Sequence, residues 1–594
     1  MVDALSVKNR RTAMIRRILV TVGCAVFFPF YYYLSTRDES VPHNYRFLLP
    51  IVFLVTVSAV QLGYFLVKLW RKNRYYGAVN NWLENNSLEL WLQGRGNRKF
   101  FWFCMIVLMV AWIPAFLAFY PGTFGYDAIP QVLMYYGHRR MSAFQPYVHS
   151  WIMGFIFKTA SDLSGSYAIG LASYIVFQMI TVTSGAARSF AYLSRKKVPV
   201  LFLLVSLGAF AFNPFFQTLT MATTKDVPFA GVLLHFLVGF LELLDAGTPG
   251  AKIRYMVELL FTGFLVCELR NQCIYIVAVM VVITLIACRK KMIVPVTMIL
   301  ICVLTLGFNA WAYRTYDIKK TDMREMLNVP IQQSYRVAYD KLTGKEPADI
   351  TDEEMAMLVR LVPEEKIYNY RGDISDPVKF NFDTQTFKAN EKEYIQLWYD
   401  LGKKNTKIYW YAFRDLLAPY WNYNIFLQRG LMFLYTNQED DIWNIQRDSK
   451  NPGYIDYLIE QNVNLRYQDN PVTFLLFEPG ICLWIMTFAF GWAIINRRRR
   501  QTLLTFWICL LFGTMMLGPA ALYRYIFPIE LAVPLMLGML WIERRPENAE
   551  AGAPVIAVAA ETELPAEETI AQATEETEEV SSTLSDTHPE DVIG

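Results

Sequence analysis

The chain has 594 residues, of which 54% are hydrophobic and 15% aromatic. Only 18% are charged, against roughly 25% in soluble domains. The formal net charge of +3 is small, and the basic residues lie in short clusters beside apolar runs rather than in one stripe. These values argue against a purely soluble multidomain protein and against a nucleic acid partner.

The apolar residues gather into runs close to the roughly 20 residues that a helix needs to cross about 30 Å of hydrocarbon. They predict an all-α polytopic membrane protein. A shorter apolar stretch at 147–157 is expected to be a helix lying along the membrane surface. Twelve spans are predicted, at 18–34, 47–70, 100–119, 166–193, 198–212, 227–244, 255–268, 273–288, 292–312, 472–495, 502–517 and 525–541.

Basic clusters follow every second predicted span. If the N-terminus is cytoplasmic, twelve spans place every cluster at an inner turn, as the positive-inside rule requires. A thirteenth span at 147–157 would break this pattern. We therefore expect a multi-pass protein of the cytoplasmic membrane with both termini in the cytoplasm. The clusters are Arg71, Lys72 and Arg74, then Arg195 to Lys197, Lys252 and Arg254, Arg289 to Lys291, and Arg497 to Arg500.

This topology divides the chain into five regions. Inside the long hydrophilic insert, Thr351 with Glu354 and Asn390 with Glu393 are spaced as helix capping boxes, so the insert should be mostly helical. The regions are 1–99 with the first two spans, the membrane core 100–312 with its outer loop 120–165, the extracytoplasmic domain 313–471, the last three spans in 472–545, and an acidic tail 546–594 expected to be disordered.

The first outer loop contains a carboxylate close to the lipid boundary. Asp127 follows the turn at Pro121 and Gly122 directly after a span, and Gln131 and His149 come later in the same loop. A single loop aspartate is usually only solvated, and a lone interfacial histidine usually has no role. These residues become candidates because other charged residues are predicted on the same face.

Two further outer turns contribute charges. Lys225 and Asp226 immediately precede a span, where a charge pair can also simply mark the membrane edge. As one helix, 255–288 would be about 50 Å long and would overshoot the bilayer, so it must turn in the middle.

That turn carries Glu268, Arg270 and Asn271, and it should lie below the outer surface. Charges at such depth cost about 2.5 to 3.5 kcal/mol each and need a partner or a wet cavity. A structural Glu268–Arg270 pair and a ligand-binding role both remain open. Arg524, at another outer helix end, is a further candidate, with snorkelling to the headgroups as the alternative.

The order and common sidedness of these motifs resemble the GT-C class of integral-membrane glycosyltransferases, and a bacterial family of multi-pass membrane proteins related to it. The resemblance covers about residues 100 to 530. Its matching residues are Pro121, Gly122, Tyr126, Asp127 and Gln131, Pro146 with His149, Thr224 to Asp226, Leu269 to Asn271, Met326 to Gln333, Ser375 to Lys379, and Gly518 and Pro519 with Arg524 and Tyr525.

The resemblance implies that Asp127 matches the first-outer-loop acidic residue that serves as a base or metal contact, and that 147–157 is the juxtamembrane helix. Many relatives have two adjacent acidic residues where this chain has Tyr126 and Asp127. No cofactor is therefore assigned, and binding of a divalent cation such as Mg²⁺ or Mn²⁺ stays open.

The predicted activity is transfer of a sugar from a polyprenyl-phosphate donor to a glycan, lipid or protein acceptor outside the membrane. One carboxylate, Asp127, suffices as base, because arginines that neutralise the lipid phosphate make it a good leaving group. Arg270 and Arg524 would hold that phosphate. Lys225, Asp226, Gln131, His149 and Asn271 would bind or orient substrates. Five aromatic residues could stack on sugars or form an interfacial belt: Tyr409, Trp410, Tyr411, Trp421 and Tyr423.

Two other functions fit the same charges. A transporter or lipid flippase also needs a charged turn in a helical bundle, although the inverted repeats and midplane site common in transporters are not evident. If the protein is instead a non-catalytic envelope assembly protein, substitution of Asp127 should not change its function.

Overall fold

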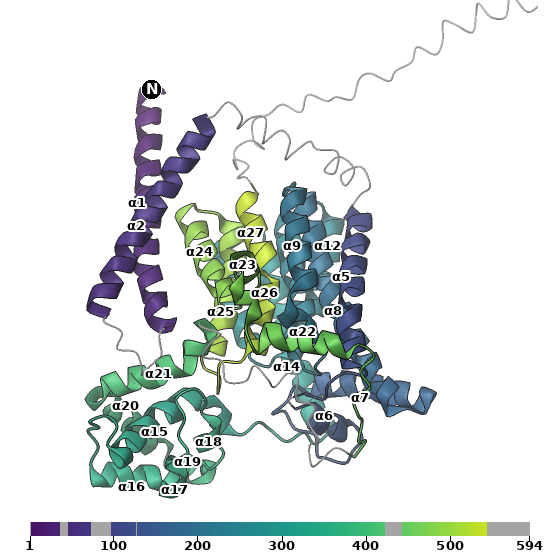
Figure 1. The fold of residues 1–594 in the computed structure, drawn as a ribbon, viewed down its shortest axis with the longest axis vertical. Helices are drawn as coiled ribbons and strands as arrows, with labels where there is room; N and C mark the ends of the chain where they lie inside the picture. The colour runs from purple at the N-terminus through teal and green to yellow at the C-terminus, as the bar shows by residue number, and fades with distance from the viewer. Residues whose placement is uncertain (1, 36–44, 73–96, 126, 422–441, 543–594) are drawn as a thin grey trace, which may run out of the picture. The chain divides into compact units, whose positions relative to one another are not determined.

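The computed structural model describes residues 2–35, 45–72, 97–125, 127–421 and 442–542. In these ranges all regular elements are α-helices or short 3-10 helices, and extended pairing is confined to isolated bridges. The predicted all-α fold class is therefore confirmed. Residues up to Ile542 form one compact unit (Figure 1).

Helices cover most of each predicted span, but two of the twelve are divided: 472–495 into α23 and α24, which are bent by 66°, and 525–541 into α26 and α27. The number of twelve spans stays a prediction. The N-terminal half contains α1 Val2–Ser35, α2 Tyr45–Lys72, α5 Asn97–Phe119, α6 Ala128–Tyr135, α7 Tyr147–Ser164, α8 Tyr167–Arg195, α9 Val200–Phe212, α10 Pro214–Thr220, α11 Asp226–Asp245, α12 Pro249–Leu269, α13 Cys273–Ala287 and α14 Ile293–Thr315.

The C-terminal half begins with short helices of the hydrophilic insert and returns to apolar helices at its end. It contains η1 Met323–Met326, α15 Asn328–Thr343, α16 Asp352–Leu361, α17 Glu364–Ile367, α18 Asp376–Lys379, α19 Thr384–Ala389, α20 Glu391–Lys404, α21 Thr406–Trp421, α22 Pro452–Asn462, η3 Arg466–Asp469, α23 Pro471–Phe477, α24 Ile481–Ile495, α25 Arg499–Met515, α26 Tyr523–Leu531 and α27 Val533–Trp541.

Among the described residues, six helical segments are long and apolar enough to cross a membrane. The number rises to eight if each of two bent pairs, α9 with α10 and α23 with α24, forms one span. Two shorter apolar helical segments, Leu49–Leu62 and Cys273–Ala287, add to these. This is the helix content of a multi-pass membrane protein.

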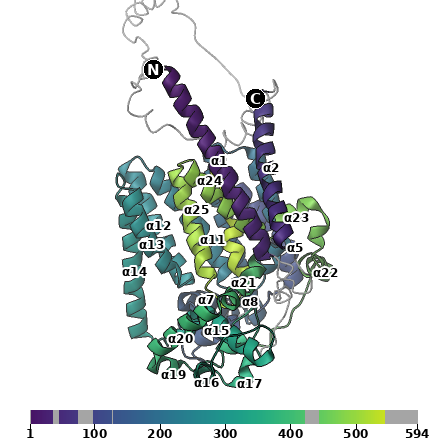
Figure 2. The same ribbon diagram turned by 90° about the vertical axis from the view of Figure 1, so that its left-hand side faces the viewer.

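Helices α8 and α11 approach each other closely through two glycines, and Figure 2 labels both of them in the helical bundle. A Cβ on Gly185 would lie 2.4 Å from the Gly231 carbonyl oxygen, and a Cβ on Gly231 would lie 2.3 Å from the Thr181 oxygen. Small residues allow such backbone contact between apolar helices. The start of α11 is thereby held against α8, which matters for the site.

The turn predicted inside 255–288 is present. Helix α12 ends at Leu269 and α13 begins at Cys273, so residues 270–272 form the apex. Glu268 and Arg270 are buried in the protein there, whereas Asn271 is exposed. The depth of the apex below the membrane surface stays a prediction. The eight cysteines are free thiols, and six of them are buried, as is usual for cysteines that act as small apolar packing residues.

The expected surface helix is longer than predicted. Helix α7 covers Tyr147–Ser164 and ends at Gly165, whose positive φ terminates it. The prediction stopped at 157 because the last turn is polar. Helix α7 packs against α6 and α8, burying Met153 and Phe157, and it is absent from the candidate spans.

Part of the hydrophilic insert has a core of its own, made by residues between Ile331 and Tyr409. We call residues 323–409 the outer domain, after the side of the membrane that the sequence predicts for them. Thr351 and Glu354 form the predicted capping box at the start of α16. The box predicted at Asn390 is wrong, because the Asn390 side chain makes no cap and instead donates to the Thr386 carbonyl (3.4 Å).

The rest of the insert packs elsewhere. Trp443 and Ile445 join the cluster around the first outer loop, whereas Leu458 and Tyr467 belong to the main helical core. Helix α21 connects the two cores, since Tyr409 lies in one and Trp421 in the other.

Candidate functional site

Two outer loops run side by side and set up the candidate site. The Thr123 amide donates to the Met221 carbonyl (2.9 Å), and the Thr223 amide donates to the Thr123 carbonyl (2.9 Å). The Thr223 hydroxyl also accepts from the Gly125 amide (3.0 Å). These bonds fix the loop that carries Asp127 beside the loop that carries Lys225.

Helix α8 holds the second loop in place. Its buried Gln178 donates to the carbonyls of Thr220 (2.9 Å) and Ala222 (3.1 Å), and it accepts from the Thr224 amide (3.2 Å). One glutamine thus satisfies three backbone groups just before α11 begins. Buried backbone groups must find such partners, so Gln178 explains how an irregular loop can lie inside the bundle.

The charged side chains converge on Asp226, the first residue of α11. Its carboxylate lies 3.4 Å from an Arg270 nitrogen and 3.7 Å from Arg524 Nε, and all three residues are buried. The Thr224 hydroxyl donates to the same carboxylate (3.2 Å). Two guanidinium groups from α12 and α26 therefore share one carboxylate.

An aromatic ring lies beside both arginines. Tyr525 has the Arg270 guanidinium 5.2 Å and the Arg524 guanidinium 5.1 Å from its ring centroid. Arg270 also lies 5.4 Å from the centre of the Phe229 ring. Cation–π contacts stabilise these positive charges without neutralising them.

Asp127 lies at the more accessible side of this cluster. Its side chain is 39% exposed, and its carboxylate is 3.9 Å from an Arg524 nitrogen. Asp127 precedes α6, but its side chain makes no helix cap. The carboxylate is therefore not occupied by a structural hydrogen bond to the helix and faces Arg524 instead.

A chain of polar side chains extends from Lys225 to α8. Lys225 donates to Gln145 Oε1 (2.5 Å), which also accepts from Gln131 Nε2 (3.4 Å). Gln131 Oε1 contacts His149 Nδ1 (2.8 Å), and His149 Nε2 contacts the Tyr174 hydroxyl (2.5 Å).

The lysine sets the direction of this chain, because an ammonium group only donates. Gln145 must present its oxygen to Lys225, so Gln131 donates to that oxygen and presents its own oxygen to His149. His149 then donates from Nδ1 and accepts at Nε2. Burial, together with the charge of Lys225, lowers the pKa of His149 to about 3, which keeps the imidazole neutral.

Lys225 itself is partly buried against the cluster. Burial lowers the pKa of its ammonium group, while the nearby carboxylates of Asp226 and Asp127 act in the opposite direction. The structure thus brings together Asp127, Gln131, His149, Lys225, Asp226, Arg270 and Arg524, all of which the sequence pointed to.

The remaining candidates lie nearby with other partners. The Asn271 amide donates to the Ala143 carbonyl (3.2 Å), which ties the α12–α13 turn to the first outer loop. The Glu268–Arg270 pair considered from the sequence is not the arrangement observed. Arg270 pairs with Asp226, whereas Glu268 accepts from Asn309 on α14 (2.9 Å).

The aromatic residues considered as a sugar platform are dispersed. Tyr409 is buried in the outer-domain core and Trp421 in the main core, so neither ring is available for stacking. Trp410 stacks on Tyr33 of α1 (ring centroids 6.4 Å apart). Tyr423 and Tyr126 lie outside the described residues.

Metal ligands do not gather in the part of the chain that the structure describes. No group of three or more His, Cys, Asp or Glu side chains lies close enough there to hold a metal ion. Both carboxylates of the cluster face arginines instead.

Three residues of the site were missing from the predicted set. Gln145, Gln178 and Tyr174 connect the loops to each other and to α8. A glutamine inside an apolar span, as at Gln178, is a usable sequence signal, because a buried amide needs partners. Tyr174 gives no such signal, since tyrosine is common in membrane helices.

The chain belongs to a family described as "Family of unknown function (DUF6020)", whose characteristic region matches residues 139–553. No curated protein and no solved structure matches the chain.

Proposed function

We propose that this member of the DUF6020 family is a membrane glycosyltransferase of GT-C-like architecture. It would transfer a sugar from a polyprenyl-phosphate donor to an acceptor on the outer face of the cytoplasmic membrane. The observation that carries the proposal is the convergence of Asp127 with Arg270, Arg524 and Lys225 at one end of the bundle.

The cluster suits an anionic phosphate. Three cationic side chains face two carboxylates, Asp127 and Asp226, so one positive charge is in excess. The arginine contacts to Asp226 are 3.4 and 3.7 Å long, whereas close charge-assisted bonds measure about 2.7 to 2.9 Å. A phosphate oxygen can therefore compete for these guanidinium groups.

Asp127 is the group placed to accept a proton. In the proposed reaction the acceptor hydroxyl oxygen forms a bond to the anomeric carbon of the sugar, and its proton passes to Asp127. The bond from that carbon to the phosphate oxygen breaks, and its electron pair stays on the lipid phosphate. Arg270 and Arg524 would stabilise the charge that develops there.

The remaining cluster residues would hold the substrates. Lys225 and Asp226 lie beside the arginines, and Gln131 and His149 act through the polar chain that ends at Lys225. Asn271 keeps the α12–α13 turn against the first outer loop. A divalent cation, if required, would be supplied with the donor phosphate.

The proposal requires twelve spans with both termini in the cytoplasm. Helix α14 gives a direct test, because Lys290 and Thr321 are exposed residues just beyond its two ends. In whole cells a cysteine at Thr321 should react with a membrane-impermeant thiol reagent, and one at Lys290 should not. The reverse pattern would put the site in the cytoplasm and contradict the proposal.

The activity is tested with purified protein in detergent and a panel of polyprenyl-phosphate sugars, following the release of lipid phosphate. Asp127→Asn keeps the shape of the side chain but accepts no proton, so turnover should fall about 100-fold or more while donor binding persists. Asp162→Asn is the matched control, since Asp162 is an exposed carboxylate on α7 that pairs with Lys158.

Equal turnover in wild-type protein and Asp127→Asn would contradict the assignment of the base. If no donor releases lipid phosphate, the flippase alternative gains weight. Movement of a fluorescent polyprenyl phosphate across vesicles would then be measured.

A further inference from the structure

The outer domain holds the loop that leads to Arg524. This loop, residues 516–522, connects α25 to α26 and has no helix of its own. The Ser375 amide donates to the Pro519 carbonyl (2.8 Å), and Asn328 Nδ2 donates to the Leu517 carbonyl (3.3 Å). Ile374 also forms an isolated bridge with Ala520.

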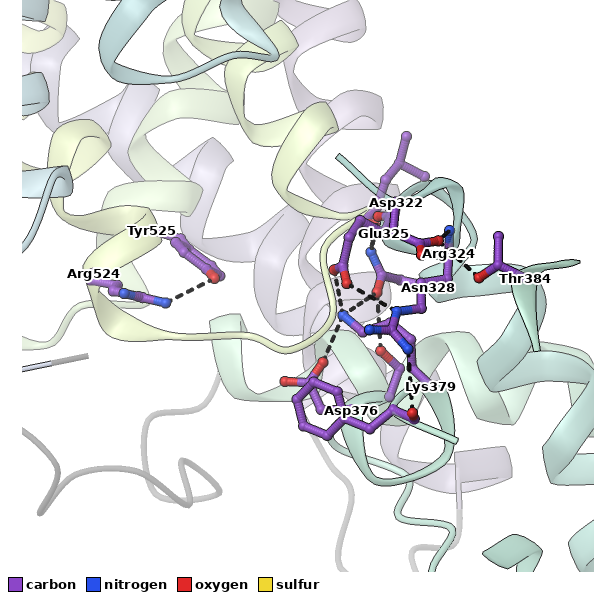
Figure 3. Close-up of polar contacts among 12 residues, drawn as sticks. Asp322, Arg324, Glu325, Asn328, Asp376, Lys379, Thr384, Arg524 and Tyr525 are labelled. Atoms are coloured by element: carbon purple, nitrogen blue, oxygen red, sulfur yellow. Dashed lines mark hydrogen bonds and ion pairs between the residues drawn. The ribbon is translucent and has the colours of Figure 1, made fainter. Parts of the chain in front are cut away.

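These contacts depend on a buried lysine (Figure 3). Lys379 has a side chain only 2% exposed, and its ammonium group lies 2.7 Å from carboxylate oxygens of both Glu325 and Asp376. It also donates to Asn328 Oδ1 (3.2 Å). A buried ammonium group is costly unless it is paired, and Lys379 has two hydrogen-bond acceptors, Glu325 and Asn328, and a further ion-pair partner in Asp376.

Lys379 decides how the Asn328 amide is oriented. Asn328 Oδ1 accepts from Lys379 and from the Ser375 hydroxyl (3.2 Å), so its nitrogen must face the opposite way. That nitrogen donates to the carbonyls of Glu325 (2.7 Å) and Leu517. The lysine thereby selects the amide orientation that can bind the loop.

We propose that Lys379 is a positioning residue for Arg524, acting through Asn328 and the 516–522 loop. The outer domain then sets the place of a guanidinium group that lies 3.7 Å from Asp226 and 3.9 Å from Asp127. The effect on donor binding rests on the proposed function, whereas the effect on the loop does not.

The structural part of the proposal is tested by hydrogen exchange of the 516–524 amides, measured by mass spectrometry on the full-length protein in detergent. Lys379→Gln should speed exchange in this loop and leave α11 unchanged. The matched control is Lys404→Gln, because Lys404 pairs with Glu354 in the same domain (2.8 Å) without touching the loop. Unchanged exchange in Lys379→Gln would overturn the proposal.

A second variant covers the case in which Lys379→Gln fails to fold. Asn328→Asp keeps an oxygen for Lys379 and Ser375 but replaces the nitrogen that donates to Leu517. It should also speed exchange of the loop. A loop as well protected as in the wild type would again contradict the proposal.

The functional part uses binding of polyprenyl phosphate in detergent. Lys379→Gln and Arg524→Gln should each weaken binding about ten-fold. The double variant should bind polyprenyl phosphate with the same affinity as Arg524→Gln alone. Additive losses would mean that Lys379 acts independently of Arg524 and would overturn the positioning role. If Arg524→Gln itself binds normally while the loop exchanges faster in Lys379→Gln, the proposed function fails and the structural link stands.

Discussion

Helix α11 carries charged clusters near both of its ends, and the two clusters are built differently. At the start of α11, Asp226 faces Arg270 and Arg524 at 3.4 and 3.7 Å. Near its end, Glu242 pairs with both Arg188 and Arg195. Arg188 also contacts Glu258 on α12 (2.9 Å).

This difference is the one expected between the proposed binding site and a structural cluster. At the far end, close ion pairs join α8, α11 and α12, so the charges themselves hold the helices together. At the candidate site, backbone bonds between loops and the amide of Gln178 do that work. The arginines there lie 3.4 and 3.7 Å from Asp226, longer contacts that suit the proposed binding of an anion.

The largest effect should come from the far cluster. Arg188→Gln leaves the nearly buried Glu242 with one cation fewer and Glu258 without its ion pair with Arg188. Removing one partner of a buried pair costs about 3 to 5 kcal/mol, and the partial exposure of Arg188 places the loss near about 3 kcal/mol. Thermal unfolding in detergent should show a clear drop in Tm.

Lys158→Gln serves as the control, because Lys158 and Asp162 are an exposed pair on α7 whose loss should hardly change Tm. An Arg188→Gln protein as stable as the wild type would remove the distinction between the two clusters.

The next effect concerns binding rather than stability. Arg524→Gln removes a charged contact worth about 1.5 to 3 kcal/mol, so the affinity for polyprenyl phosphate should fall about 10- to 100-fold. Asp226 keeps Arg270, and Tm should therefore change little. Binding is measured by calorimetry with the Tm of the same sample. A large fall in Tm with unchanged affinity would make Arg524 structural, like Arg188.

The sequence was informative about the fold because a membrane restricts both the length of an apolar helix and the positions of the charged residues at its ends. Both the spans and the turn at 270–272 come from such arguments. Helix ends set by local polar bonds were harder, as the end of α7 and the missing cap at Asn390 show. Spacing alone cannot tell whether a side chain turns toward its own helix or toward another partner.

For the site, the sequence supplied the residues but not their pairing. Arg270 lies two residues from Glu268, yet its ion-pair partner is Asp226 from a different helix. The sequence also could not reveal that Gln145 links Lys225 to Gln131, because these contacts form only where the loop of Gln131 and Gln145 meets the loop of Lys225. The common sidedness of the charges was the only signal available, and the structure shows that they do converge.

A smaller effect should appear in the pH dependence of binding. Burial lowers the pKa of Lys225, so its charge is lost as pH rises through a value below the usual range near about 10.5. Below that pH the site keeps its excess positive charge, and above it the affinity for polyprenyl phosphate should fall about ten-fold.

Lys225→Arg keeps its charge throughout this range and should not show the fall at alkaline pH. Folding stability should change in the opposite direction and rise over the same pH range, because the cost of burying charged Lys225 is relieved once the lysine is neutral. If the affinity of Lys225→Arg falls with rising pH as much as that of the wild type, Lys225 is excluded as the titrating group.

The smallest effect is expected from His149, which acts only through the polar chain to Lys225. Its pKa of about 3 keeps it neutral from pH 5 to 8, and both ring nitrogens already have partners in Gln131 and Tyr174. His149→Gln should therefore reduce kcat/KM only a few-fold and leave the shape of the pH profile unchanged between pH 5 and 8. A base would behave differently, since its loss would cost about 100-fold or more and remove a limb of the profile. Such a result would identify His149 as the base, and the carboxylate of Asp127 would then be a substrate contact.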